Sequence, residues 1–79
     1  MHYVYILNLK NGQKYVGYTT NIDDRYARHV RGEACETTER IPVESLDFYA
    51  AFKDEQKARD FEKYLKSSSG FAFRSKRLL

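Results

Sequence analysis

Two short aromatic tripeptides carry the residues of this chain that are best suited to chemistry. Tyr3-Val4-Tyr5 and Tyr15-Val16-Gly17 stand on either side of a turn, and Arg25 and Glu62 follow at helical positions. A phenol can accept a proton, a guanidinium can hold a phosphate, and a carboxylate can bind a hard cation. These groups together match the needs of a metal-assisted cleavage of a phosphodiester bond.

The order and spacing of these residues resemble the GIY-YIG nuclease superfamily, which is named after its two tripeptides. Here the tripeptides read YVY and YVG, so a tyrosine replaces the first glycine, while the tyrosine of each tripeptide and the second glycine are kept. The family's helical arginine falls on Arg25, its companion ring residue on His29 and its metal-binding glutamate on Glu62. The chain looks like a small stand-alone member, similar to the catalytic domain of the bacterial excision-repair incision subunit.

The resemblance implies a one-metal hydrolysis of a DNA phosphodiester bond. Glu62 would hold Mg²⁺ or Mn²⁺, with waters and phosphate oxygens completing the coordination shell. Arg25 would clamp non-bridging oxygens, and His29 would orient a phosphate or a tyrosine. Tyr5 and Tyr15 would position and deprotonate water, with Tyr15 the favoured base. A free phenol has a pKa of about 10, so Arg25 and the metal must lower it.

Local patterns predict the strands and helices that position these residues. Residues 3–9 are apolar on both faces and predict a covered strand, which a turn at Asn11-Gly12 connects to a second strand over residues 14–19. Asn21 is expected to cap a helix over residues 22–31, which Gly32 ends.

The second half of the chain continues this alternation. Residues 33–42 are predicted to form a polar loop and residues 43–52 a third strand, and Asp54 is expected to cap a long helix that runs to about residue 66. The order ββαβα(α) predicts an α+β fold, a three-stranded antiparallel sheet flanked by helices. We expect one domain over residues 1–79.

The hairpin loop decides whether the two tyrosines can act together. A two-residue loop, Asn11-Gly12, would place Tyr5 opposite Tyr18 and turn Tyr15 to the other face of the sheet. A three-residue loop over residues 10–12 would place Tyr5 and Tyr15 on the same face, because side chains alternate along a strand. We predict the three-residue loop, with Gly12 in the left-handed conformation.

The first helix is expected to bury an apolar stripe made of Ile22, Tyr26 and Val30. Arg25 and His29 flank this stripe and should lie where the helix meets the sheet. A purely structural role remains open for both residues: Arg25 in a salt bridge at the boundary, and His29 as a packed, hydrogen-bonded ring. The tyrosines could equally be ordinary cross-strand pairs of a core.

The second helix repeats the arrangement of the first. Ala58, Phe61 and Leu65 form its apolar stripe, and Glu62 lies at the edge of that stripe. Glu62 could therefore pair with neighbouring cations of its own helix, Arg59 and Lys66, at a gain of a few tenths of a kcal/mol.

Positive charge gathers in the C-terminal third of the chain. Residues 1–52 carry six Lys or Arg against seven Asp or Glu, and residues 53–79 carry eight against four. The segment from Lys66 to Arg77 mixes aromatic and cationic residues, which suits contact with a nucleic-acid backbone. The predicted nucleic-acid contacts are Gly17, Arg28, Arg31, Lys66, Arg74, Lys76 and Arg77.

We therefore expect a metal-dependent, structure-directed DNA endonuclease that acts on branched, flapped or damaged DNA in repair or recombination. The alternative is a catalytically weak or inactive module on the same fold, which binds nucleic acid or protein. The chain has no apolar run of membrane-spanning length and a single cysteine, Cys35, so we expect a cytoplasmic protein. A monomer is expected, and a small-molecule substrate is not.

Overall fold

The chain begins with a β-hairpin whose register brings the two tyrosines together. In the computed structural model, which describes residues 1–67, strands β1 (His2–Leu9) and β2 (Lys14–Thr19) pair antiparallel, with Tyr5 opposite Gly17 and Leu7 opposite Tyr15. The Leu9 N–H donates to the Gln13 carbonyl at 2.9 Å, and Gly12 has a φ of 88°. The predicted three-residue loop is confirmed. Tyr5 and Tyr15 therefore project from one face of the sheet.

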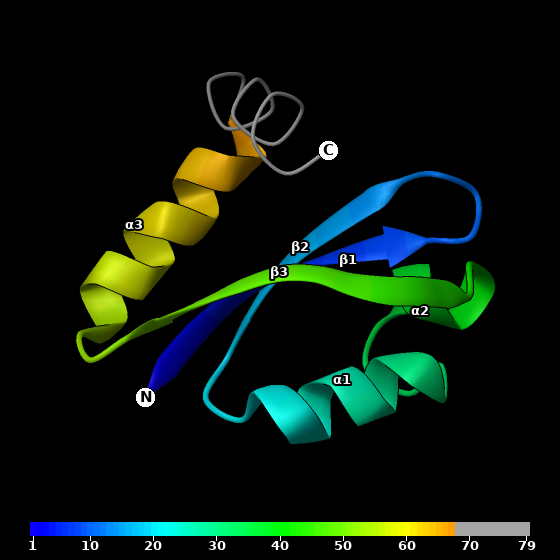
Figure 1. Ribbon diagram of the computed structural model, residues 1–79, viewed down its shortest axis with the longest axis horizontal. Helices are drawn as coiled ribbons and strands as arrows, with labels where there is room; N and C mark the ends of the chain where they lie inside the picture. The colour runs from blue at the N-terminus through cyan, green and yellow to red at the C-terminus, as the bar shows by residue number, and fades with distance from the viewer. Residues whose placement is uncertain (68–79) are drawn as a thin grey trace.

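A third strand completes the sheet along the other edge of β1. Strand β3 (Val43–Phe52) pairs antiparallel with β1, so the strand order is β2-β1-β3 and β1 is central. Two irregularities in this pairing, between Ile6 and Leu7 and between Asn8 and Leu9, bend the ladder. The α+β fold and the antiparallel three-stranded sheet are thus confirmed (Figure 1).

Among residues 1–67, two of the three helices begin at the predicted caps. Helix α1 (Ile22–Val30) follows Asn21, whose side chain accepts a hydrogen bond from the Asp24 N–H at 3.1 Å. Gly32, with a φ of 74°, ends this helix by donating its N–H to the His29 carbonyl. Helix α3 (Glu55–Lys66) is capped by Asp54, which accepts from the Gln56 N–H at 2.9 Å.

The predicted loop over residues 33–42 was wrong in part, because it contains a short helix. Helix α2 (Glu36–Arg40) follows Cys35, and the buried side chain of Thr38 holds it against α1. An ion pair between Glu36 and Arg40, at 2.9 Å, also stabilises this helix. The helix is only five residues long, so apolar periodicity in the sequence does not indicate it.

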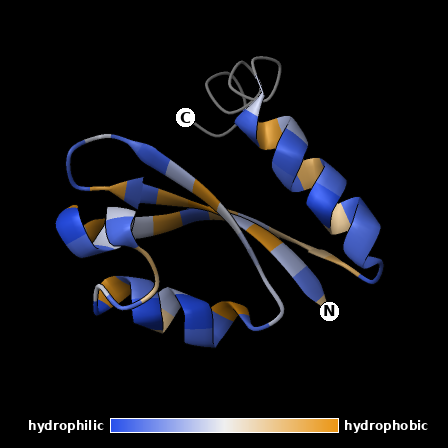
Figure 2. Cartoon of the chain, turned by 180° about the vertical axis from the view of Figure 1, so that it is seen from behind, coloured by the Kyte–Doolittle hydropathy of each residue, from blue (hydrophilic) through white to orange (hydrophobic). Residues whose placement is uncertain are grey.

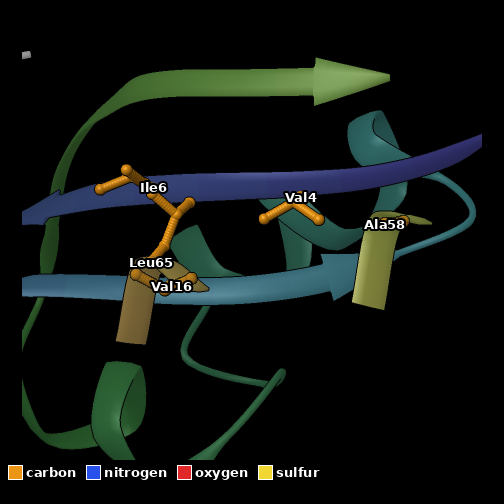
Figure 3. Packing of buried hydrophobic residues seen from close by; sticks show 5 residues of the cluster. All are labelled: Val4, Ile6, Val16, Ala58 and Leu65. Carbon is orange, nitrogen blue, oxygen red and sulfur yellow. The ribbon is translucent and has the colours of Figure 1, made fainter. Parts of the chain in front are cut away.

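Helices cover both faces of the sheet, and each face has its own core. On one face α3 places Ala58 and Leu65 against Val4 and Ile6 of β1 and Val16 of β2 (Figure 3). On the other face, Tyr5, Leu7 and Leu9 form a second core, against which partly buried side chains of α1, of the connection after α2 and of strands β2 and β3 pack. These side chains are Tyr15, Ile22, Tyr26, Ile41, Val43 and Leu46.

The hydropathy of the ribbon follows this layering. Apolar segments lie along the strands in the middle of the molecule, and polar segments lie on the outer sides of the helices (Figure 2). Central β1 is covered on both faces, as its sequence predicted. Within residues 1–67, no helix combines the length and the apolar character needed to cross a membrane.

One member of the predicted α1 stripe faces solvent. Val30 is 58% exposed, whereas His29 is 1% exposed and takes its place on the buried side. At 100° per residue His29 lies only about 20° from Ile22, and Val30 lies about 80° away, so the buried face centres on the histidine. A histidine can occupy this position because both of its ring nitrogens have hydrogen-bond partners.

Candidate active site

A buried tyrosine–histidine pair forms the centre of the site. The Oη atom of Tyr5, on β1, lies 2.8 Å from Nε2 of His29, on α1, and both side chains are only 1% exposed. Their rings meet edge to face, with centroids 5.6 Å apart. The contact joins the central strand to the helix that covers it.

Gly17 makes room for this pair. A Cβ atom at position 17 would lie 2.3 Å from Oη and 2.4 Å from Cζ of Tyr5, too close for any side chain. Gly17 was predicted to contact nucleic acid; in the structure, the space where a side chain would stand is filled by the Tyr5 phenol. The role of Gly17 is therefore steric: because it has no side chain, the Tyr5 ring can lie across β2.

The second tyrosine completes an aromatic group on the same face. The ring of Tyr15 lies 6.4 Å from that of Tyr5 and 5.2 Å from the imidazole of His29, measured between centroids. Arg25, one turn before His29 on α1, is half-buried and interacts with Tyr5 through hydrogen bonding and charge. Four of the five predicted catalytic side chains therefore meet on the α1 face of the sheet.

Two residues of the site were not foreseen. Nδ1 of His29 lies 2.9 Å from Oγ1 of Thr38, which is itself 3% exposed, and Sγ of Cys35 lies 3.5 Å from the same hydroxyl. The Cys35 thiol is also a hydrogen-bond partner of Tyr15. Thr38 and Cys35 come from the segment predicted to be a loop, and nothing in their spacing points to His29.

Burial keeps the rings of the site uncharged. It raises the pKa of the Tyr5 phenol, against the opposing hydrogen bond and charge of Arg25, and burial likewise raises the pKa of Tyr15. Burial and then the positive charge of Arg25 lower the pKa of His29 to about 4. We expected Arg25 to lower the phenol pKa values; it does so, but burial outweighs it.

The pKa of the Cys35 thiol, unlike those of the rings, is shifted so as to favour the charged form. Burial raises its pKa, but hydrogen bonds from the side chain and backbone of Thr38, from Tyr15 and from the Thr37 backbone together outweigh burial. The pKa of Cys35 therefore lies below its usual value. Its sulfur is the natural acceptor for the two neighbouring hydroxyl groups.

Glu62 approaches the site from the other side of the sheet. It lies on α3, which packs on the Val4–Ile6 face, yet its negative charge contributes to the raised pKa of Tyr5. Lys66, the predicted nucleic-acid contact of this helix, donates to Glu62 Oε2 at 2.9 Å. Arg59 pairs instead with Glu55 at 3.5 Å and lies over the Tyr18 ring at 4.1 Å.

The donors present suit a metal held mostly by water and substrate. Among residues 1–67, no three His, Cys, Asp or Glu side chains gather closely enough to enclose a metal ion. Glu62 is a single hard carboxylate whose side chain is 18% exposed and whose Oε2 atom is paired with Lys66. Such a donor fits Mg²⁺ or Mn²⁺, which keep several waters, and does not fit a zinc site.

The predicted peripheral contacts are placed only in part. Arg28 and Arg31 are exposed, and Arg31 pairs with Glu33 at 2.9 Å. Arg74, Lys76 and Arg77 lie outside the described residues, so their predicted contact with a nucleic acid stays a prediction.

Comparison with known proteins now decides the family. A family model described as the GIY-YIG catalytic domain matches residues 1–76. The chain belongs to the GIY-YIG family. The two tripeptides, Arg25, His29 and Glu62 all lie within the matched range.

Its relatives include several members of the UPF0213 group. A UPF0213 protein of Bacillus licheniformis is 36% identical over 69 residues, which are 86% of this chain and 70% of that protein. A UPF0213 protein of Natronomonas pharaonis is 41% identical over 69 residues, covering 86% of this chain and 80% of the relative.

A solved structure agrees with the fold. The solution NMR structure of UPF0213 protein BH0048 from Bacillus halodurans superimposes with a TM-score of 0.59 at 34% sequence identity. The match covers 98% of this chain and 85% of that one. The α+β fold is thus shared with this UPF0213 protein.

Proposed function

We propose that the protein is a metal-dependent endonuclease that hydrolyses DNA phosphodiester bonds by a one-metal mechanism. The observation that carries this proposal is the Tyr5–His29 contact of 2.8 Å beside Arg25 and Tyr15. A buried phenol paired with a neutral imidazole can pass a proton, and the neighbouring guanidinium can hold a phosphate. Membership of the GIY-YIG family supports the same reaction class.

Tyr5 is better placed than Tyr15 to act as the base. Tyr5 can take a proton from the attacking water as its own proton passes to Nε2 of His29, 2.8 Å away. Tyr15 has no such basic partner, since its hydrogen-bond partner is the Cys35 thiol. The sequence favoured Tyr15, and the contacts of the two phenols favour Tyr5, with Tyr15 packed beside it.

Substrate binding would make His29 a better proton acceptor. Part of the fall in its pKa comes from the positive charge of Arg25. A phosphate held by Arg25 would offset that charge and raise the pKa of His29 back towards its usual value. Water would then attack phosphorus as its proton moves to Tyr5, and the bond from phosphorus to the leaving oxygen would break.

Glu62 would hold the divalent metal ion in this proposal. The ion would neutralise negative charge on the scissile phosphate and on the leaving oxygen. Lys66 would have to release the carboxylate as the ion binds, because it donates to Glu62 Oε2 at 2.9 Å. The ammonium group of Lys66 would then be available for a phosphate of the substrate.

A nicking assay on branched and flapped DNA tests the proposal. Cleavage by the wild-type protein should need Mg²⁺ or Mn²⁺ and should fall at least about 100-fold in Glu62→Gln and in Tyr5→Phe. Glu55→Gln is the matched control, because Glu55 is an exposed glutamate of the same helix. Cleavage that survives Glu62→Gln unchanged would contradict the mechanism. DNA binding without cleavage would support the non-catalytic module instead.

A further inference from the structure

Thr38 holds the outer nitrogen of the buried histidine. Its hydroxyl lies 2.9 Å from Nδ1 of His29, while Tyr5 lies 2.8 Å from Nε2 of the same ring. All three side chains are buried, with 3% or less of each exposed. Helix α2 lies beside α1 (Figure 1), and the hydroxyl of its Thr38 contacts this ring.

One set of hydrogen bonds satisfies every group around this contact. Arg25 is a donor only, so the Tyr5 oxygen accepts from Arg25 and keeps its own hydrogen, which it can donate to Nε2. A neutral imidazole with a bare Nε2 carries its hydrogen on Nδ1, which donates to Thr38. The Thr38 hydroxyl then has its own hydrogen to donate to Cys35 Sγ, 3.5 Å away, in a contact where either group can be the donor.

We infer that Thr38 is a positioning residue that fixes His29 in the tautomer with hydrogen on Nδ1, so that Nε2 is bare and accepts the proton of Tyr5. The inference about rate rests on the proposed nuclease function, and the tautomer itself does not. In the opposite tautomer Nε2–H would point at Tyr5, and the phenol would have no acceptor for its proton. The chain of donors runs from Arg25 through Tyr5, His29 and Thr38 to Cys35.

The tautomer is measured directly in the free protein. Long-range ¹H–¹⁵N correlation spectra of protein labelled with ¹⁵N-histidine separate a protonated ring nitrogen from a bare one. We expect protonated Nδ1 and bare Nε2 for His29 at neutral pH in the wild-type protein. Protonated Nε2 in this spectrum would overturn the inference, and this result depends on no variant and no substrate.

Variants at Thr38 test its part in the arrangement. Thr38→Val keeps the shape and removes the hydroxyl, so the preference for protonated Nδ1 should be lost, whereas Thr38→Ser should retain it. Thr37→Val is the matched control, because Thr37 is the exposed neighbour on the same helix. A Thr38→Val spectrum identical to that of the wild-type protein would show that Thr38 does not set the tautomer.

Cleavage rates separate the inference from the proposed function. Thr38→Val should lower the rate about 10–100-fold, with DNA affinity unchanged and with activity restored in Thr38→Ser. A wild-type rate in Thr38→Val would overturn the role in catalysis. If no variant and no wild-type sample cleaves DNA while the spectra show the expected tautomer, the proposed function fails and the assignment of Thr38 stands.

Discussion

A neutral histidine beside an arginine is the feature from which the chemistry of this site follows at the scale of single residues. His29 is buried between Tyr5 and Thr38, and the charge of Arg25 acts on it. Both burial and the nearby cation disfavour the imidazolium form. The ring is therefore a hydrogen-bonding link at neutral pH and becomes a charged group only when acid or a bound anion changes its surroundings.

This state of His29 predicts how stability depends on pH. The folded pKa is about 4, against about 6.5 in an unfolded chain, so between these pH values the unfolded state binds a proton that the native state does not. The contribution of His29 is fully present above about pH 6.5, and it is lost as the pH falls towards 4, by roughly 3 kcal/mol at most.

Thermal unfolding of wild-type protein and of His29→Gln, between pH 8 and pH 4, checks this expectation. The variant should be less stable at pH 8, and its stability should fall less steeply with acid. His2→Gln is the control, because His2 is only partly buried and its ring contacts Tyr18, not the residues around His29. Parallel curves for His29→Gln and wild type would exclude His29 as the source of the acid sensitivity.

At the scale of elements, the site depends on two helices that pack on opposite faces of the sheet. Helix α1 brings Arg25 and His29 to Tyr5, and α3 brings Glu62 from the other face. The only charged partner that α3 places within 3 Å of the Glu62 carboxylate, among the described residues, is Lys66. Metal binding must therefore compete with an ion pair inside one helix.

Removing that ion pair should strengthen metal binding slightly. A pair of this spacing within one helix contributes about 0.3–0.5 kcal/mol, so Lys66→Gln should raise Mn²⁺ affinity at Glu62 about twofold. Paramagnetic broadening of NMR signals during a Mn²⁺ titration measures this affinity. Lys63→Gln, an exposed lysine of the same helix, controls for the general loss of positive charge.

The position of the broadening is as informative as the affinity. Signals around Glu62 should broaden first, since its carboxylate is the proposed ligand. Broadening centred on the acidic residues of the α2 region, Glu33, Glu36 and Glu39, would remove the metal assignment. An equal gain from Lys63→Gln would show that the effect comes from net charge alone.

At the scale of the whole molecule, charge is distributed unevenly along the chain. The eight cations and four acidic residues of positions 53–79 contrast with six and seven in the rest. A polyanion should therefore be attracted to the C-terminal third and repelled by the acidic segment near α2. Because the positive charge gathers in a short segment, affinity should be weak and sensitive to salt.

Replacing Arg74, Lys76 and Arg77 together with Ala should flatten the slope of log affinity against log salt by up to about 3 units, because each phosphate contact contributes roughly 0.9. The slope is measured by fluorescence anisotropy on duplex DNA. The double variant Arg28→Ala with Arg31→Ala serves as the comparison. An unchanged slope in the triple variant with a flatter slope in the double variant would move the contact surface to α1.

The strands, the caps and the hairpin register were determined by the sequence, because each depends on a few neighbouring residues. Gly12 allows the left-handed turn, and Asn21 and Asp54 supply oxygens that cap the helix N-termini. The alternation of side chains along β1 then determines which residues share a face of the sheet. The family's site residues could be placed on these elements in the same way. The prediction that Tyr5 and Tyr15 share a face follows from one turn.

Only the tertiary structure decided which of these side chains touch and what charge they carry. The burial of His29 in place of Val30, and its contact with Thr38 nine residues further on, depend on how α2 packs against α1. The rotation of a helix by a few tens of degrees changes which side chain is buried, and apolar periodicity does not define it that closely. Burial then sets the pKa values of the rings, and burial belongs to the packed molecule alone.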